Sequence, residues 1–138
     1  MTTIRNNLIC TIIGKDDLDH CCLKHLSPEL DQADQAVIYN GCTRVVCPMD
    51  NSSEVIFASL VLGRFPRARV EAWIRSPEQL KRLRSDPFAS SVLSQCEICL
   101  RPLSLARLRG WQFARADYII LVQGNNCPHV AVRALTNS

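Results

Sequence analysis

Cysteine and histidine residues that occur in close pairs are the feature of this sequence that most constrains its fold. Eight of the 138 residues are cysteines, which stabilise a domain through disulfides, a bound metal or plain burial. The first apolar run, 8–13, is shorter than the roughly 7–15 apolar residues of a secretory signal, so we expect an intracellular protein, cytoplasmic or nuclear, with reduced thiols. No stretch reaches the roughly 18 apolar residues of a membrane span, so no membrane partner is expected.

The clearest candidate for a metal site is the Cys-x-x-Cys pair Cys96-Glu-Ile-Cys99. Two residues between the thiolates let a tight turn direct both sulfur atoms at one ion, and structural zinc sites combine such pairs with a second pair brought close by the fold. Cys127 and His129 form that second pair, with 27 residues between Cys99 and Cys127. We therefore predict one zinc ion bound by Cys96, Cys99, Cys127 and His129. The alternative is that Cys127 and His129 are ordinary residues beside a turn.

A second candidate zinc site lies in the amino-terminal half. Cys22 and His25 are spaced by nearly one helical turn, which places them on one face of a helix, and Cys42 and Cys47 flank a predicted strand. Two alternatives stay open. His20 and Cys21 can replace His25 and Cys22 as ligands, or the second site does not exist and a single four-cysteine site forms from Cys42, Cys47, Cys96 and Cys99. Plain burial is the competing explanation for each cysteine, and for Cys10 it is the one we expect.

Short β-prone runs alternate with capped helical segments, which predicts a single compact α+β domain spanning 1–138. The Asn40-Gly41 dipeptide joins the runs 36–39 and 42–47 and predicts a type I′ hairpin. Ser76-Pro77 and Asp86-Pro87 each predict a helix start, since the first residue caps and proline fits the first helical turn.

Proline and glycine residues predict further ends of helices. Ser27-Pro28 predicts the end of one short helix and the start of another, and Gly110 predicts the end of a helix that begins at Ser104. The segment 54–62 fits either a helix or a buried strand. We expect further strands at 8–13, 70–74 with one solvated face, 118–122 and 127–133.

The charges are divided unevenly along the chain. Residues 1–63 carry four basic and eight acidic side chains, whereas 64–115 carry eleven basic and four acidic ones, a net charge of +7, and 116–138 are neutral. Arginine matches phosphate with two parallel donors and stacks on bases. We therefore predict RNA binding by the arginine-rich segment, while ion pairs with the acidic half remain the alternative. The candidate residues are Arg64, Arg67, Arg69, Arg75, Lys81, Arg82, Arg84, Arg107 and Arg109.

No motif for catalysis is present in the sequence. There is no H-E-x-x-H zinc motif, no phosphate-binding G-x-x-x-x-G-K loop and no G-x-G-x-x-G dinucleotide motif. The chain contains the cysteines and histidines that a cysteine nucleophile would need, but no local sequence signature supports one. We therefore expect a protein that is not an enzyme.

The small size, the paired cysteines such as Cys96-Glu-Ile-Cys99, the scattered histidines and the arginine-rich body loosely resemble the zinc-binding suppressors of RNA silencing encoded by sobemoviruses. The likeness covers no alignable stretch, and this chain has one Cys-x-x-Cys pair where that family has two. The resemblance implies a viral suppressor of host defence. The first hypothesis is thus a zinc-stabilised, RNA-binding regulator. The second is a zinc-stabilised adaptor or assembly subunit that binds a host protein, and the third is a cysteine-nucleophile enzyme. The sequence leaves the oligomeric state open.

Overall fold

A six-stranded mixed sheet organises the chain, in the order β4-β3-β2-β1-β5-β6. The computed structural model describes residues 8–16, 18–124 and 131–136. The predicted single α+β domain is confirmed. The elements are β1 (Leu8–Ile13), α1 (His20–Tyr39), β2 (Cys42–Cys47), α2 (Ser52–Arg64), β3 (Arg69–Ile74), α3 (Pro77–Ser85), α4 (Pro87–Ser94), β4 (Glu97–Leu100), α5 (Leu105–Arg115), β5 (Tyr118–Gln123) and β6 (Ala131–Thr136).

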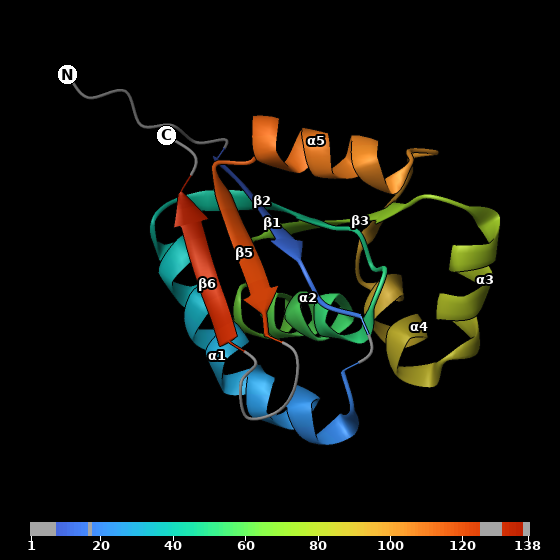
Figure 1. Ribbon diagram of the computed structural model, residues 1–138, viewed down its shortest axis with the longest axis horizontal. Helices are drawn as coiled ribbons and strands as arrows, with labels where there is room; N and C mark the ends of the chain where they lie inside the picture. Colours follow the sequence, from blue (N-terminus) through green and yellow to red (C-terminus); the bar gives the residue numbers. More distant parts are fainter. Residues whose placement is uncertain (1–7, 17, 125–130, 137–138) are drawn as a thin grey trace.

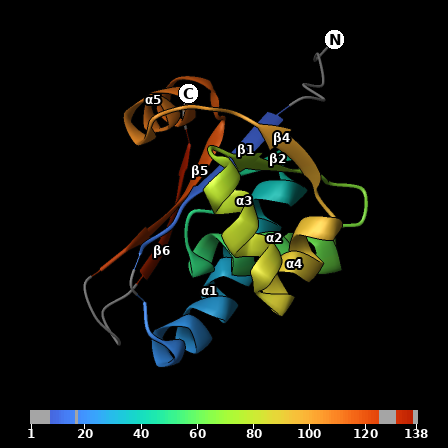
Figure 2. The same ribbon diagram turned by 90° about the vertical axis from the view of Figure 1, so that its right-hand side faces the viewer.

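The first five strands run parallel, and only β6 pairs antiparallel, with β5. From β1 the chain moves outward through β2 and β3 to β4, and it then returns across the sheet to β5 on the other side of β1. Crossovers between parallel strands are right-handed, so reversing the direction of travel moves the connecting helix to the opposite face. Accordingly, α1 to α4 cover one face of the sheet and α5 lies on the other (Figures 1 and 2).

The face under α1 to α4 holds the main apolar core. Phe57 of α2 and Leu30 of α1 are fully buried against Ile12, Val45 and Ala72 from three neighbouring strands. On the opposite face, a smaller cluster joins Val46, Trp73 and Leu108 beneath α5. Among the described residues, no helix is long and apolar enough to cross a membrane.

The predicted helix starts are confirmed by their capping bonds. The Ser76 hydroxyl accepts the Gln79 amide and the Asp86 carboxylate accepts the Phe88 amide, at the starts of α3 and α4. The ambiguous segment 54–62 is helical, within α2, and Asn51 caps that helix. The strand over 70–74 is also present, as β3, but both its faces are covered: Glu71 is 2% exposed. The predicted solvated face is wrong because α1 to α4 cover one face of the sheet here and α5 covers the other.

The hairpin predicted at Asn40-Gly41 is wrong. Residues 36–39 are the last turn of α1, and the amides of Asn40 and Gly41 donate to the carbonyls of Val37 and Ile38. Gly41 has a φ of +105°, the left-handed conformation that ends many helices. The same dipeptide suits a type I′ turn and a helix C-terminus, and burial of Leu26, Leu30 and Val37 on one helical face selects the helix.

Two predicted helix breaks are also absent. Pro28 lies inside the continuous helix α1, and Gly110 lies inside α5, which extends to Arg115. Each residue costs helix stability, but Leu30 and Leu108, two residues away in each case, are fully buried. Burial of these neighbouring side chains therefore offsets the cost of proline and glycine, and both helices continue past them. The last strand, β6, is Ala131–Thr136, and residues 127–130 of the predicted strand lie outside the described residues.

Candidate functional site

The cysteines of the core are small buried side chains with protonated thiols. Cys10, Cys42 and Cys47 are at most 1% exposed and belong to the main core. Burial raises the pKa of Cys42 to about 12 and that of the half-buried Cys96 to about 11, and it raises the pKa of Cys47 well above its usual range. A buried thiol of this kind lacks the thiolate that nucleophilic attack requires.

The structure separates the predicted ligands Cys42 and Cys47. An irregularity in the pairing of β2 with β1 turns both side chains to the same core, although five residues along a regular strand would face opposite sides. They nevertheless lie at the two ends of β2, roughly 15 Å apart at about 3.3 Å per residue, while a zinc–sulfur bond is about 2.3 Å. His25 is exposed on α1. These residues do not converge on one ion.

Cys96 and Cys99 lie on opposite faces of the sheet, because β4 begins between them. The Cys96 thiol packs against the main core and donates to the Val92 carbonyl at 3.3 Å. The Cys99 sulfur packs under α5 and lies 3.9 Å from the Glu71 carboxylate. The alternative four-cysteine site is not formed by these described residues, because Cys99 lies on the other face of the sheet from Cys47 and Cys96, and Cys42 lies at the far end of β2.

The remaining predicted ligands are not all described. Cys127, His129 and the side chain of Cys22 lie outside the described residues, together with the alternates His20 and Cys21. Within 8–16, 18–124 and 131–136, no group of three or more histidine, cysteine or acidic side chains is placed to hold a metal ion. The zinc site that includes Cys127 and His129 stays a prediction.

Three of the predicted RNA-binding arginines form ion pairs within the protein. Arg64 pairs with Asp31 at 2.6 Å and Arg75 with Asp50 at 3.0 Å, so both connect the arginine-rich segment to the acidic half. Arg69 pairs with Glu97 at 2.7 Å. For Arg64 and Arg75, these are the ion pairs with the acidic half that the sequence left open as the alternative to RNA binding.

The other predicted basic residues divide between two surfaces. Lys81, Arg82 and Arg84 are exposed on α3, whereas Arg107 is exposed on α5. No ion pair links these four residues to another described side chain. Arg67 is exposed in the α2–β3 loop, and Arg109 of α5 donates to the Gln112 side chain at 2.6 Å.

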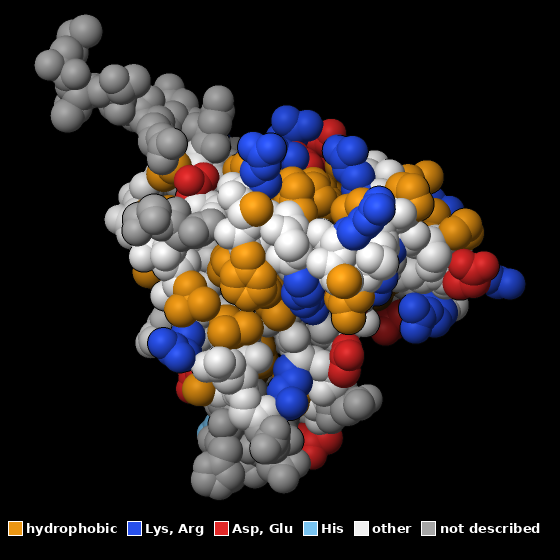
Figure 3. Space-filling view, turned by 45° about the horizontal axis from the view of Figure 1, so that its top comes forward, with side chains coloured by type: hydrophobic (Ala, Val, Ile, Leu, Met, Phe, Trp, Pro, Cys, Tyr) orange, Lys and Arg blue, Asp and Glu red, His pale blue; other side chains and the backbone are white. Residues whose placement is uncertain are grey.

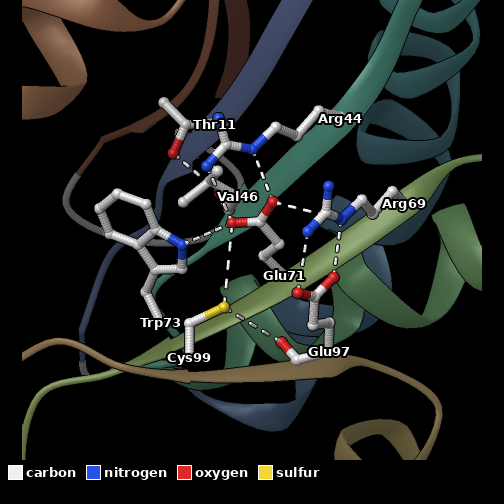
Figure 4. A network of polar contacts seen from close by, with 8 residues as sticks. All are labelled: Thr11, Arg44, Val46, Arg69, Glu71, Trp73, Glu97 and Cys99. Atoms are coloured by element: carbon white, nitrogen blue, oxygen red, sulfur yellow. Dashed lines mark hydrogen bonds and ion pairs between the residues drawn. The ribbon is translucent and has the colours of Figure 1, made fainter.

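A buried carboxylate holds the charged face of the sheet together (Figure 4). Glu71 accepts two hydrogen bonds from Arg44, at 2.6 and 3.0 Å, and one from the Trp73 indole at 3.0 Å. Arg69 lies 3.6 Å from the same carboxylate while it binds Glu97. Burial raises the pKa of Glu71. The hydrogen bonds from Arg44 and Trp73 and the nearby arginine charges lower it by more, so the pKa lies below its usual value. Glu71 thus stays ionised beneath α5.

The surface above this network combines arginine with aromatic rings. Trp73 packs against Trp111 of α5 with ring centroids 4.2 Å apart, and the Arg101 guanidinium lies 5.0 Å from the Trp73 ring. Phe113 and Leu105 are 52% and 48% exposed on α5. Figure 3 shows basic side chains gathered around hydrophobic ones on this face. Such a combination can pair with phosphate and stack on bases.

Sequence reasoning missed the buried acid that braces the opposite end of the sheet. Glu54 of α2 is 0% exposed and accepts the amides of Gly14 at 2.9 Å and Asp50 at 2.7 Å, which joins the loops after β1 and β2. Burial raises its pKa to about 7, although the two amides lower it. A side chain at Gly14 would collide with Ser53, Asn51 and Glu54. Only the glycine that ends β1 hinted at this contact.

Comparison with known proteins finds no family model and no curated protein that matches the chain. The resemblance to the viral zinc-binding suppressors stays a prediction.

Proposed function

We propose that the domain is a non-enzymatic protein that binds RNA through the surface of α5. The observation that carries the proposal is the charge of this helix: it holds Arg107, Arg109 and Arg115 and no acidic residue. Arg107 and Arg115 are exposed and form no ion pair with a described residue. Their guanidinium groups suit phosphate, and the exposed ring of Phe113 suits an unpaired base.

The ion pairs narrow the set of RNA-binding residues. Arg64, Arg69 and Arg75 already bind carboxylates, so phosphate would have to replace an existing partner at each of them. Arg107 and Arg115 of α5 and the neighbouring Arg101 form no ion pair with a described carboxylate, so they carry no such cost. Shape and charge, rather than base edges, are the features of RNA that this surface suits.

The test is a titration of short single-stranded and duplex RNA, followed by fluorescence anisotropy at about 50 and 200 mM salt. The double variant Arg107→Glu with Arg115→Glu should bind at least about tenfold more weakly than the wild type, because each charge reversal removes a phosphate contact and adds repulsion. Wild-type affinity should itself fall steeply between the two salt concentrations.

The matched control makes the same charge change on α3, with Lys81→Glu and Arg84→Glu. These residues lie on a helix of the opposite layer, so the control should retain most of the wild-type affinity. An equal loss in both double variants would show that only net charge matters. Wild-type protein that binds no RNA at low salt would contradict the proposal.

A protein-binding adaptor is the second candidate, favoured by the exposed apolar side chains around α5. Leu105 and Phe113 are 48% and 52% exposed on this helix, and exposed apolar patches mark many protein interfaces. Binding of a protein partner that Leu105→Asp abolishes, at an affinity indifferent to salt and to the arginine changes, would favour this function.

Zinc forms a separate part of the proposal. We expect an ion bound by Cys127 and His129, whereas Cys96 and Cys99 lie on opposite faces of the sheet beside β4, which three strands separate from β5. Metal analysis of protein purified under reducing conditions should find about one zinc per chain, and a chelator should lower the Tm. A metal-free protein with an unchanged Tm would contradict this. Suppression of host RNA silencing is the role that such an RNA-binding protein would serve if the resemblance holds.

A further inference from the structure

A cavity of about 600 Å³ lies on the face of the sheet opposite α5. It is enclosed by α1, by the start of α2 and by the pair α3 and α4, which stand together beside the carboxyl ends of β2 and β3 (Figure 2). Ligand cavities in proteins span roughly 300–1,000 Å³, so this one is large enough for a small organic molecule. The cavity plays no part in the proposed RNA surface, and the inference from it does not depend on that function.

The walls of the cavity are mainly apolar. Met49 and Val55, from the loop after β2 and the start of α2, are buried, and they face Leu83 of α3 and Ala89 of α4. Phe88, which is 51% exposed, adds an aromatic ring at the opening. An apolar body bound there would be removed from water, which is the main source of affinity in such a site.

The loop that forms one wall is held in place by α3. Met49 has a φ of +60°, a conformation that is costly for a residue with a side chain and persists only where surrounding contacts impose it. The contact is supplied by the buried Gln79, whose amide donates to the Pro48 carbonyl at 2.8 Å and to Asp50 at 3.2 Å. The cavity is therefore preformed rather than created by a ligand.

The charges at the rim leave a surplus of positive charge. Asp50 accepts from Arg75 at 3.0 Å, and Asp86 accepts the Phe88 amide at 3.0 Å as the cap of α4. Lys24 of α1 and Arg82 of α3 also line the cavity and are exposed, and neither forms an ion pair with a described side chain. The rim thus offers two cations to a ligand, while Asp50 accepts through Oδ1 and Asp86 accepts the Phe88 amide; Asp50 Oδ2 has no partner among the described residues.

We propose that this cavity binds a small amphipathic organic anion. The apolar ring or chain of the ligand fills the space between Met49, Val55 and Leu83. Its carboxylate, sulfonate or phosphate pairs with Lys24 and Arg82. A neutral apolar molecule leaves both cations unpaired, and an inorganic anion leaves the walls empty, so the arrangement selects a ligand that has both parts.

The first test uses 8-anilinonaphthalene-1-sulfonate, a fluorescent probe with aromatic rings and one sulfonate. The wild type should bind it at a single site. The double variant Lys24→Gln with Arg82→Gln should weaken binding about tenfold, whereas Lys81→Gln with Arg84→Gln, which removes the same charge outside the cavity, should leave it unchanged. Equal weakening by both double variants would overturn the proposal, as would a wild type that does not bind the probe.

The second test fills the cavity. Ser52→Trp places a large ring at an exposed position of its wall and should abolish binding of the probe, while Ser91→Trp on the exposed side of α4 should not. Urea unfolding of each variant checks that the fold is intact. Undiminished binding by a folded Ser52→Trp would overturn the proposal, since it would place the probe elsewhere.

Competition identifies the apolar part of the ligand. Octanoate and phenyl phosphate carry an anionic group on a chain and on a ring, respectively. Displacement of the probe by octanoate supports a chain-bearing ligand, and displacement by phenyl phosphate supports a ring-bearing one. Displacement by neither compound at millimolar concentration would overturn the proposal.

Discussion

The two faces of the sheet use the same strands for different purposes. In β3, Val70, Ala72 and Ile74 point into the apolar core under α1 to α4, whereas Glu71 and Trp73, which alternate with them, lie under α5. One face buries aliphatic side chains beneath four helices. The other buries an ionised carboxylate beneath a single helix. The comparison shows that a charge can be buried in this domain where donors surround it.

The charged face also leaves its cations at the surface. Glu71 and Glu97 engage Arg44 and Arg69 within the sheet, while Arg107 and Arg115 of α5, one layer further out, form no ion pair with a described carboxylate. On the apolar face, the carboxylates at the rim accept hydrogen bonds within the protein, and the helices leave a pocket that opens to solvent. The two candidate binding sites therefore differ in kind: a convex basic surface on one side and a mainly apolar pocket on the other.

The largest effect is expected on the apolar face. Phe57→Ala removes a fully buried ring from α2 and should lower the free energy of unfolding by about 4 kcal/mol, through lost burial and the cavity left behind. Urea unfolding followed by circular dichroism measures the change. A loss below about 1 kcal/mol would show that this face is not the main source of stability.

A somewhat smaller effect is expected on the charged face. Glu71→Ala leaves the donors of Arg44 and Trp73 without their acceptor and should lower the free energy of unfolding by about 3 kcal/mol. The control Glu97→Ala breaks the exposed pair with Arg69 and should change the midpoint of urea unfolding very little. If both variants lower the free energy of unfolding equally, the burial of Glu71 does not add to the contribution of its ion pairs.

Asp34 sharpens the comparison, because it is a buried acid on the apolar side without the donors that Glu71 has. It is 0% exposed, and neither of its carboxylate oxygens has a hydrogen-bond partner among the described residues that meets the usual distance and angle limits. Burial and the charge of Asp31 raise its pKa to about 7, while Arg64 and the Gln35 amide lower it. Between the unfolded value near 3.8 and 7, the folded state binds more protons, so stability falls as pH rises through this window.

Asp34→Asn removes the ionisation and should raise the free energy of unfolding by about 1–2 kcal/mol at pH 8, with a gain that shrinks toward pH 5. Thermal unfolding of both proteins at the two pH values measures this gain. Glu54 is present in both proteins, so its own titration cancels when they are compared at the same pH. The control Glu78→Gln removes a carboxylate from an exposed position of α3 and should leave stability nearly unchanged at both values. A gain that does not depend on pH would show that Asp34 does not titrate in this range.

Several elements could be predicted from the sequence because their signals are local. Ser76-Pro77 and Asp86-Pro87 start helices through bonds to amides only two or three residues away. The run 118–122 forms a strand, within β5, because its apolar residues suit burial on both faces. The turn at Asn40-Gly41 was predicted wrongly because two structures share that signal and a distant contact selects between them.

The candidate sites depended on information that is not local. Cys96-Glu-Ile-Cys99 has the spacing of a metal-binding turn, yet β4 begins within it and separates the thiols by a sheet. The cavity beside Met49 could not be predicted, since its walls come from four helices and a loop. Arg64, Arg69 and Arg75 have the composition of a nucleic-acid surface, but acids distant in sequence bind them.

The sequence by itself determined where most helices and strands begin, which segments are apolar, and that the arginines are concentrated in 64–115. These properties follow from capping, periodicity and charge over a few residues. Only the tertiary structure decided which thiols share a face, which arginines form ion pairs with distant carboxylates, and that Pro28 and Gly110 lie within helices. The physical reason is that each of these outcomes is set by burial and by charge partners that the fold brings together across the sheet.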